Sequence, residues 1–197
     1  MKQIALPFPK RGGRRKGAGR PRVRSHPGLP GPGVPHLRRE AFAAREPVHV
    51  TQRVRPGVGY LRSQLRSTLI LAALRKANGL RVVHYSIQGN HLHLIVEAAG
   101  AGELSRAMQG LASSIARGLN RLAGRRGGVF VDRFHAHPLR TPREVANALR
   151  YVRENRRHHA PEPLPPAFRD ELSSAIDSPL LEPRVWLLRV GWLRAPR

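Results

Sequence analysis

Two histidines separated by one leucine, His91-Leu92-His93, carry the clearest chemical signal in the sequence. The apolar run that they begin is typical of a β-strand, in which residues i and i+2 point to the same side. Two imidazoles on one side of a strand can bind a single divalent cation. The alternative is a pair of half-exposed strand histidines without a ligand, and an isolated His-x-His motif is more often of that kind. The motif therefore predicts a metal site only together with further ligands.

A tyrosine and an asparagine, Tyr151 and Asn155, are candidates for those further groups. They lie four residues apart on a predicted helix, so their side chains share one helix face. The apolar stripe of that helix passes through Val145, Leu149 and Val152, which places Tyr151 at its polar margin. A phenolate is a nucleophile, and a carboxamide oxygen can bind a metal. The alternative is a tyrosine that packs its ring and exposes its hydroxyl.

The elements that position these groups follow from hydrophobic periodicity. Alternation predicts strands, and apolar residues at helical spacing predict helices. In chain order the sequence predicts a strand over 48–54, a helix over 61–78, strands over 81–88 and 91–97, a helix over 103–122, a strand over 129–139 and a helix over 142–159. Gly89-Asn90 between two strands is typical of a hairpin turn. A capping box, Thr141-Pro-Arg-Glu144, begins the last helix.

This order predicts an α+β fold of the ferredoxin-like type, β-α-β-β-α-β, with an antiparallel sheet and an additional C-terminal helix that carries Tyr151. We expect two helices on one face of the sheet and an open face opposite. The hairpin register gathers apolar side chains on the helix-covered face: Val83, Tyr85, Ile87, Leu92, Leu94 and Val96. The open face receives polar side chains: His84, Ser86, Gln88, His91, His93 and Glu97. Among these, Gln88 and Glu97 are candidates to support metal ligands.

Charge and composition indicate a polyanionic partner. The 197 residues carry a formal net charge of +24, and nearly all of the 36 basic residues are arginine. The guanidinium fork suits phosphate contacts, so nucleic acid is the expected partner. The absence of cysteine excludes disulfides, thiolate zinc sites, iron–sulfur clusters and cysteine nucleophiles. Any metal must be bound by histidine and oxygen ligands.

The chain divides by composition into three parts. Residues 1–45 are rich in Arg, Gly and Pro and predict a disordered basic arm, residues 46–160 a folded domain, and residues 161–197 a Pro-rich linker with an apolar tail. In the arm, Gly-Arg-Pro-Arg resembles an AT-hook whose Arg20 and Arg22 would enter a minor groove; a generic basic tail is the alternative. The sequence lacks an apolar run long enough to span a bilayer and a signal peptide, so we expect a cytoplasmic, nucleoid-associated protein without a membrane partner.

Two motifs resemble those of a known family. The segment Gln88-Gly-Asn-His-Leu-His-Leu-Ile-Val96 resembles the His-apolar-His signature of the HUH endonucleases, preceded by the Asn usual in the single-tyrosine transposases of small insertion sequences. Tyr151-Val-Arg-Glu-Asn155 resembles the helix motif of the REP-associated tyrosine transposases. The resemblance covers roughly residues 45–160. One departure is Arg156, which stands where many relatives have proline.

The resemblance implies a transposase of a mobile element. Such an enzyme cleaves single-stranded DNA in a metal-dependent reaction and transfers the strand through a 5′-phosphotyrosine intermediate, which is the chemistry of DNA transposition and recombination. Tyr151 would be the catalytic nucleophile, His91, His93 and Asn155 would bind Mg²⁺ or Mn²⁺, and single-stranded or hairpin DNA would be the partner. The arginines expected to bind DNA are Arg20, Arg22, Arg106, Arg117, Arg121, Arg125, Arg126, Arg133, Arg150 and Arg153. A solvated basic face is the alternative for them. Homodimerisation, and whether Tyr151 acts within its own subunit, stay open.

Other functions remain to be weighed against this one. A domesticated relative could bind hairpin DNA or RNA without cutting it. RNA-recognition modules of similar topology stack bases on sheet aromatics, but aromatic residues make up only 5% of this chain. A metal phosphoesterase that activates water would leave the Tyr-Asn helix unexplained. A second pair, His135 and His137, repeats the His-x-His spacing and is either a pair of surface histidines or a contact to DNA or metal.

Overall fold

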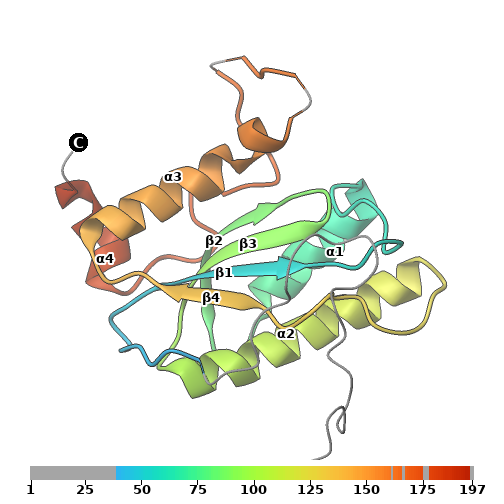
Figure 1. Cartoon of the computed structure of the whole chain (residues 1–197), viewed down its shortest axis with the longest axis horizontal. Helices are drawn as coiled ribbons and strands as arrows, with labels where there is room; N and C mark the ends of the chain where they lie inside the picture. The colour runs from blue at the N-terminus through green and yellow to red at the C-terminus, as the bar shows by residue number, and fades with distance from the viewer. Residues whose placement is uncertain (1–38, 161, 166, 175–177, 196–197) are drawn as a thin grey trace, which may run out of the picture. The chain divides into compact units, whose positions relative to one another are not determined.

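Four strands form one antiparallel sheet in the order β2-β3-β1-β4 in the computed structural model (Figure 1). The strands are β1 (Val48–Arg53), β2 (Arg81–Ile87), β3 (His91–Glu97) and β4 (His135–Pro138). The helices are α1 (Gln64–Arg75), α2 (Ala101–Leu122), α3 (Pro142–His159), the short α4 (Trp186–Arg189) and the 3-10 turn η1 (Gly191–Arg194). The structure describes residues 39–160, 162–165, 167–174 and 178–195.

The predicted α+β fold class is confirmed. Every neighbouring pair of strands is antiparallel, and the chain order is β-α-β-β-α-β followed by α3. The capping box that begins α3 is present, because the Thr141 side chain accepts from the Glu144 N–H and the Glu144 carboxylate accepts from the Thr141 N–H. Since α3 carries both Tyr151 and Asn155, this box fixes where the helix that bears them begins.

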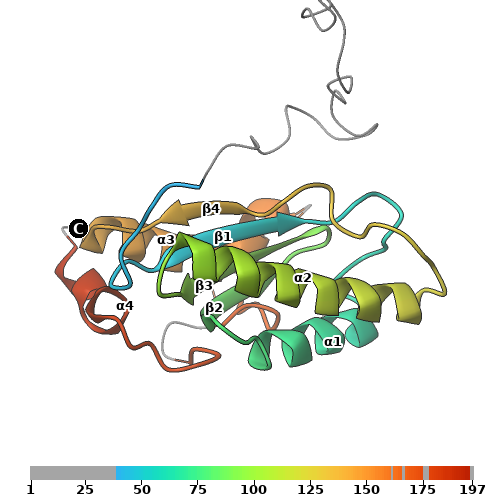
Figure 2. The same cartoon turned by 90° about the horizontal axis from the view of Figure 1, so that it is seen from below.

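Helices α1 and α2 cover one face of the sheet and form the main core. Figure 2 shows α2 in front of the strands and α1 below α2 in the view. The buried face of α2 recurs at a spacing of three to four residues, as the sequence predicts: Leu104, Met108, Leu111, Ile115 and Leu119. These side chains pack with strand residues that alternate toward the same face, among them Val48, Val50, Leu92 and Leu94.

The opposite face is not open, which corrects the expectation from sequence. Helix α3 packs on it through an apolar stripe that includes Val145, Leu149 and Val152. This stripe belongs to a second buried cluster, which also contains Ile95 of β3 and Leu188 of α4. The physical reason is that α3 has an apolar side of its own, and burying that side on the sheet removes it from water. The sheet is therefore sandwiched between α1 and α2 on one side and α3 with α4 on the other.

A β-bulge in β2 corrects the predicted side of one residue. His84 pairs with Ile95 and Ser86 with His93, as a regular hairpin register predicts, but that register also sets Val82 opposite Glu97, whereas Val82 pairs with Val96 because of an irregularity between Val82 and His84. A bulge inserts one extra residue, so the alternation of sides is interrupted. Val82 consequently joins the core under α1 and α2, whereas Val83, expected on that side, joins the cluster under α3.

Strand β4 is shorter than predicted and begins at His135 rather than at residue 129. The preceding residues still follow the end of β1, through a single bridge between Val54 and Phe130. Side chains satisfy their carbonyl groups in place of a regular ladder: Arg55 Nε donates to Phe130 O over 2.9 Å, and Gln52 Nε2 donates to Asp132 O over 3.0 Å. Backbone groups bonded to side chains in this way need no strand partner.

The C-terminal part of the chain runs along the outer edge of β2. The N–H of Ile87 donates to Leu172 O over 2.8 Å, and the N–H of Ser174 donates to Tyr85 O over 3.0 Å. Arg62, before α1, forms two hydrogen bonds with the buried carboxylate of Asp170, over 2.6 and 3.0 Å. These contacts hold the segment 170–174, which is defined here as the clasp segment, on the domain.

The predicted domain boundaries stay predictions, and most of the N-terminal arm, with Arg20 and Arg22, lies outside the described residues. Near the predicted boundary, the guanidinium group of Arg39 lies 3.5 Å from the centre of the Phe134 ring, and Glu40 pairs with Arg140 over 2.5 Å. In the described part of the chain, no helix is both long and apolar enough to cross a membrane.

Candidate active site

Strand β3 places His91 and His93 next to each other on the side of the sheet that α3 covers. Their ring centres are 4.8 Å apart with the ring planes nearly perpendicular, and both side chains are buried. The residue between them, Leu92, points to the other side and packs in the α1–α2 core. Alternation in a strand thus anchors the pair and directs both imidazoles to one place.

Helix α3 brings Tyr151 to the same place. The Tyr151 ring lies edge-on to His93, with ring centres 5.1 Å apart, and also near His49, with ring centres 5.8 Å apart. Its side chain nevertheless stays 39% exposed. A phenol in this position touches the buried histidines and can still be reached from solvent by a polymer.

Asn155 lies one turn further along α3 and is fully buried. Its position continues the spacing of Val145, Leu149 and Val152, so it belongs to the side of the helix that faces the sheet. Neither its amide nitrogen nor its amide oxygen has a hydrogen-bond partner among the described residues. Burying an amide in this way costs about 1–3 kcal/mol. A polar group at such a cost is typical of a ligand-binding position.

His49 of β1 is part of the site, although the sequence reasoning did not select it. Its Nε2 lies 3.2 Å from Nδ1 of His93, and the two rings are stacked with centres 5.3 Å apart. Thr51 Oγ1 lies 3.1 Å from the same nitrogen. The sequence did contain a signal for His49, because alternation in the strand β1 puts residues 49 and 51 on the same side of the sheet. What the sequence did not provide was the pairing of β1 with β3, which sets Thr51 opposite His93.

The electrostatic surroundings keep His49 neutral. Burial, with a smaller electrostatic contribution from the neighbouring His137 and His135, lowers its pKa to about 4. At neutral pH its ring is therefore uncharged. A neutral ring beside His93 does not repel a cation, so the environment of the histidine pair is compatible with a metal ion.

The ring nitrogens of the predicted ligands are oriented by neighbours. Nδ1 of His91 lies 2.7 Å from Asn90 Oδ1, the residue that precedes the pair. Nδ1 of His93 lies within hydrogen-bond distance of Thr51 and His49. When Nδ1 of a histidine is engaged in this way, Nε2 is the nitrogen that binds a metal.

The donor set suits a modestly bound divalent cation. In the described residues, no group of three or more His, Asp or Glu side chains is placed to bind a metal. A metal here would depend on the two imidazoles of His91 and His93 and on an amide oxygen. Asn155, which is buried and has no hydrogen-bond partner in the described part of the chain, is an amide that fits this need. Two nitrogens and one neutral oxygen leave positions for water and phosphate oxygens around Mg²⁺ or Mn²⁺.

Gln88 and Glu97, the two hairpin residues considered from sequence as support for the metal ligands, make different contacts. Gln88 is buried, and its Nε2 donates to Ser86 Oγ over 2.7 Å while its Oε1 has no partner among the described residues. Glu97 lies at the opposite end of β3, and its Oε1 accepts from the backbone N–H groups of Arg184 and Val185 over 2.8 and 2.9 Å. Glu97 thus holds the C-terminal tail rather than the histidine pair, against the role considered from sequence.

The remaining residues that the sequence singled out lie on β4, on α3, on α2 and in the segment between α2 and β4. His135 and His137 are exposed on β4, in register with Thr51 and His49. On α3, Arg150 and Arg153 are exposed on either side of Tyr151, and Arg153 pairs with Glu154. The other arginines predicted to bind DNA that the structure describes lie in α2 or in the segment between α2 and β4: Arg106, Arg117, Arg121, Arg125, Arg126 and Arg133. Those of α2 belong to the layer on the far side of the sheet.

Comparison with known proteins places the fold. No protein-family model matches the sequence, and no curated protein matches it. Among solved structures, a REP-associated tyrosine transposase bound to a REP hairpin aligns with a TM-score of 0.51 and 14% identity, over 64% of this chain and 75% of that chain. A bacterial tRNA(His) guanylyltransferase-like protein in complex with GTP aligns over 65% and 74%, with 12% identity and a TM-score of 0.44. The likeness to the transposase is one of fold.

Proposed function

We propose that this chain is a metal-dependent single-strand DNA endonuclease and strand transferase that acts through Tyr151, as a transposase does. The observation that carries the proposal is the contact of the half-exposed Tyr151 ring with His93, next to His91. A reachable phenol supplies a nucleophile, and the adjacent histidine pair supplies imidazoles that can bind a metal ion beside it. The fold that the chain shares with a tyrosine transposase supports it.

The reaction conserves the energy of the bond that it breaks. The Tyr151 phenol loses its proton to solvent, and its oxygen attacks the scissile phosphorus in line with the 3′ oxygen. The bond from phosphorus to that 3′ oxygen breaks, and the oxygen leaves as a 3′-hydroxyl after taking up a proton from solvent, so no net proton is gained or lost. The 5′ phosphate then remains ester-linked to Tyr151. A second 3′-hydroxyl can attack this linkage and restore a phosphodiester without ATP.

His91, His93 and Asn155 would hold the Mg²⁺ or Mn²⁺ ion. When bound, the ion polarises the scissile phosphate and offsets charge that develops in the displacement. The contribution of the protein is to fix the two rings through Asn90, Thr51 and His49, and to keep the amide of Asn155 away from water.

Single-stranded or hairpin DNA is the proposed substrate, and transposition of a mobile element is the proposed setting. The net charge of +24 favours a nucleic acid. Arg150 and Arg153 flank Tyr151 on the exposed side of α3, where a bound strand would meet them. The solved transposase of similar fold is bound to a REP hairpin, which supports a hairpin as the partner here.

A covalent-adduct assay tests the proposal. The wild type and Tyr151→Phe are incubated with 3′-labelled and, separately, 5′-labelled single-stranded hairpins in Mg²⁺ or Mn²⁺, and the products are separated on a denaturing gel. We expect a protein-linked product that carries the 3′ label and a free fragment that carries the 5′ label, both only with the wild type. Tyr85→Phe is the matched control, because it removes a phenol from β2, outside the site, and should leave the adduct unchanged.

Three other outcomes would each contradict the mechanism in a different way. Nicking by Tyr151→Phe at the wild-type rate would show that water or another group is the nucleophile. Nicking without any adduct would favour a metal phosphoesterase. Tight hairpin binding by both proteins with neither nicks nor adducts would favour a domesticated, non-cutting nucleic-acid-binding protein.

A further inference from the structure

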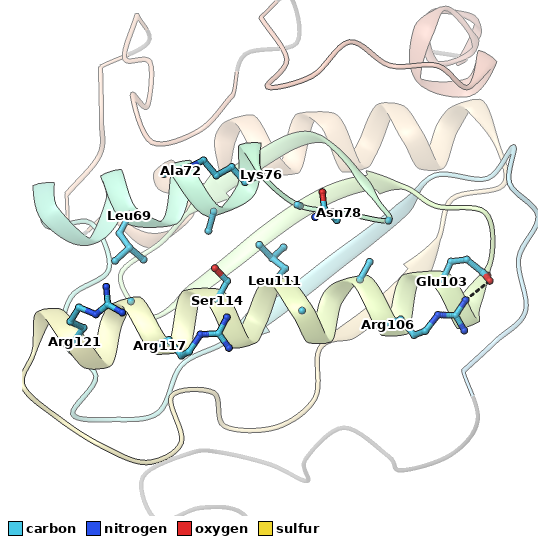
Figure 3. A pocket seen from close by; sticks show the side chains of 16 residues that line it. Leu69, Ala72, Lys76, Asn78, Glu103, Arg106, Leu111, Ser114, Arg117 and Arg121 are labelled. Carbon is cyan, nitrogen blue, oxygen red and sulfur yellow. Dashed lines mark hydrogen bonds and ion pairs between the residues drawn. The ribbon is translucent and has the colours of Figure 1, made fainter.

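A cavity of about 850 Å³ lies between α1 and α2, on the side of the sheet away from Tyr151. Figure 3 shows its walls, with Lys76 at the end of α1 and Arg106, Arg117 and Arg121 along α2. We call this cavity the α1–α2 groove. The proposed cleavage reaction makes no use of it, since Tyr151 and the histidine pair lie under α3.

Positive charge lines the α1–α2 groove along its length. The three arginines recur on one side of α2, and Arg106 and Arg121 are separated by 15 residues, which corresponds to about 22 Å of helix. All four cationic side chains are exposed. Glu103 is the one acidic residue among the described residues that line the groove, and it is already paired with Arg106 over 2.8 Å. The other three cations face the groove without an acidic partner in that lining.

Small residues form part of the lining of the α1–α2 groove. Ala72, Ala73, Ala107 and Gly110 are among them, and a Cβ at Gly110 would meet no atom within 4 Å. Small side chains let a bulky polymer approach the helix backbones closely, while the long cationic side chains reach it from the rim. The spacing of these cations along a straight helix also favours an extended anion over a small one.

The described residues that line the groove include no Phe, Tyr, Trp or His. Proteins that bind single strands stack exposed bases on aromatic rings, which this surface does not offer. A base-paired segment hides its bases and presents only phosphates to such a surface. The lining therefore fits a duplex backbone better than an unpaired strand.

We propose that the α1–α2 groove binds the phosphate backbone of double-stranded DNA, as a second nucleic-acid site on the side of the sheet opposite to Tyr151. The inference goes beyond the proposed function, because it holds whether or not Tyr151 cleaves DNA. A chain with both sites holds a duplex on one side of the sheet and an unpaired strand on the other.

Lysine footprinting of the full-length protein tests this site directly. Lys76 is the only lysine after residue 16, so the reactivity of one side chain reports on the groove, while Lys2, Lys10 and Lys16 report on the arm. The protein is acetylated in EDTA, so that cleavage plays no part, with saturating duplex of about 20 base pairs, two helical turns, or with a single strand of equal length. Peptide mass spectrometry then gives the acetylation rate at each lysine.

We expect duplex to slow acetylation of Lys76 several-fold, and the single strand to have little effect on it. Unchanged reactivity of Lys76 in the presence of duplex would overturn the proposal. So would equal protection by both forms of DNA. Protection of the arm lysines alone would mean that the arm, and not the groove, binds the duplex.

Salt titration of duplex binding gives a second, independent readout. Arg117→Gln/Arg121→Gln should reduce the slope of log K against log salt by about 2, because each phosphate contact contributes about 0.9. The matched control, Arg75→Gln/Arg189→Gln, removes the same charge from exposed positions outside the groove and should leave the slope close to that of the wild type. Equal slopes for the two double variants would show that net charge alone governs binding. Circular dichroism of both variants confirms that each is folded before its slope is compared.

Discussion

The buried amide of Asn155 is the residue whose surroundings contribute most to the proposed chemistry. A side chain that is 0% exposed and lacks hydrogen-bond partners among the described residues does not contribute to folding through its polar atoms. It lies one turn from Tyr151 on the same helix. A function in ligand binding explains why a polar residue occupies a position in an apolar stripe.

Replacing this amide should separate stability from metal binding. Asn155→Leu removes polar atoms that have no hydrogen-bond partner among the described residues, so we expect the free energy of unfolding in EDTA to stay constant or to rise by about 1 kcal/mol. The same change removes a proposed ligand, so Mn²⁺ affinity should fall at least about 10-fold. Urea unfolding and calorimetric Mn²⁺ titration measure the two quantities.

Asn147→Leu, at an exposed position of the same helix, is the control and should leave Mn²⁺ affinity unchanged. A clear loss of stability in Asn155→Leu without metal would mean that the amide is hydrogen-bonded within the folded chain. Unchanged Mn²⁺ affinity would remove Asn155 from the proposed ligand set.

Sequence alone brought the principal residues of the candidate site into view, but not all of them. Alternation places His91 and His93 on one side of a strand, and helical spacing places Tyr151 and Asn155 on one face of a helix, because those rules depend only on neighbours along the chain. That the two pairs form one site was implied by the family resemblance, not by these rules. His49 depends on which strands pair, and that is a long-range property. Thr51, which contacts His93 as well, was missed for the same reason.

At the scale of elements, local signals predicted the helices and strands well where capping and periodicity are strong. Helix α3 spans the predicted 142–159, because a capping box and a following proline bound it. The bulge at Val83 and the early end of the regular β4 ladder were not foreseen. Both result from contacts with distant segments, such as Arg55 with Phe130, that no local pattern contains.

The clasp segment is an element that sequence reasoning left as irregular linker, and it should depend on one ion pair. Asp170→Asn keeps the shape of the side chain but leaves the Arg62 guanidinium without its charged partner, in a largely buried setting. We expect a loss of about 2–4 kcal/mol in the free energy of unfolding. Limited proteolysis between α3 and α4 should become faster as the segment leaves β2.

The contrasting variant is Glu154→Gln, which removes a surface partner of Arg153. Exposed pairs of this kind contribute about 0–1 kcal/mol, so its unfolding free energy should be close to that of the wild type. Equal effects of the two substitutions would show that the Arg62–Asp170 pair does not anchor the segment.

At the scale of the whole molecule, buried histidines link stability to pH. Burial lowers the pKa of His84 to about 4, whereas an unfolded chain has a histidine pKa near 6.5. Between these values the unfolded state binds more protons, so stability falls as the pH falls from about 6.5 towards 4. Above about pH 7 the contribution of His84 is complete and constant.

His84→Gln should flatten this dependence. Glutamine does not titrate and can still hydrogen-bond to Ser174, which lies 3.1 Å from Nδ1 of His84. The wild type should lose up to about 1.4 kcal/mol per pH unit through this one group, and the variant correspondingly less. Urea unfolding at intervals between pH 7.5 and 4.5 measures both slopes. Parallel curves would show that His84 is not buried in its neutral form.

The two outer strands of the sheet also limit how this protein can associate with other chains. The outer edge of β2 is occupied, because backbone groups of Leu172, Ser174 and Leu180 bond to it. The other outer strand, β4, has four residues and ends at Pro138, which has no N–H to donate. Short or covered edge strands disfavour the edge-to-edge strand pairing that leads to aggregation. In the described part of the chain, a second copy would therefore have to dock on helices or loops, and the sheet would stay the size it is within one chain.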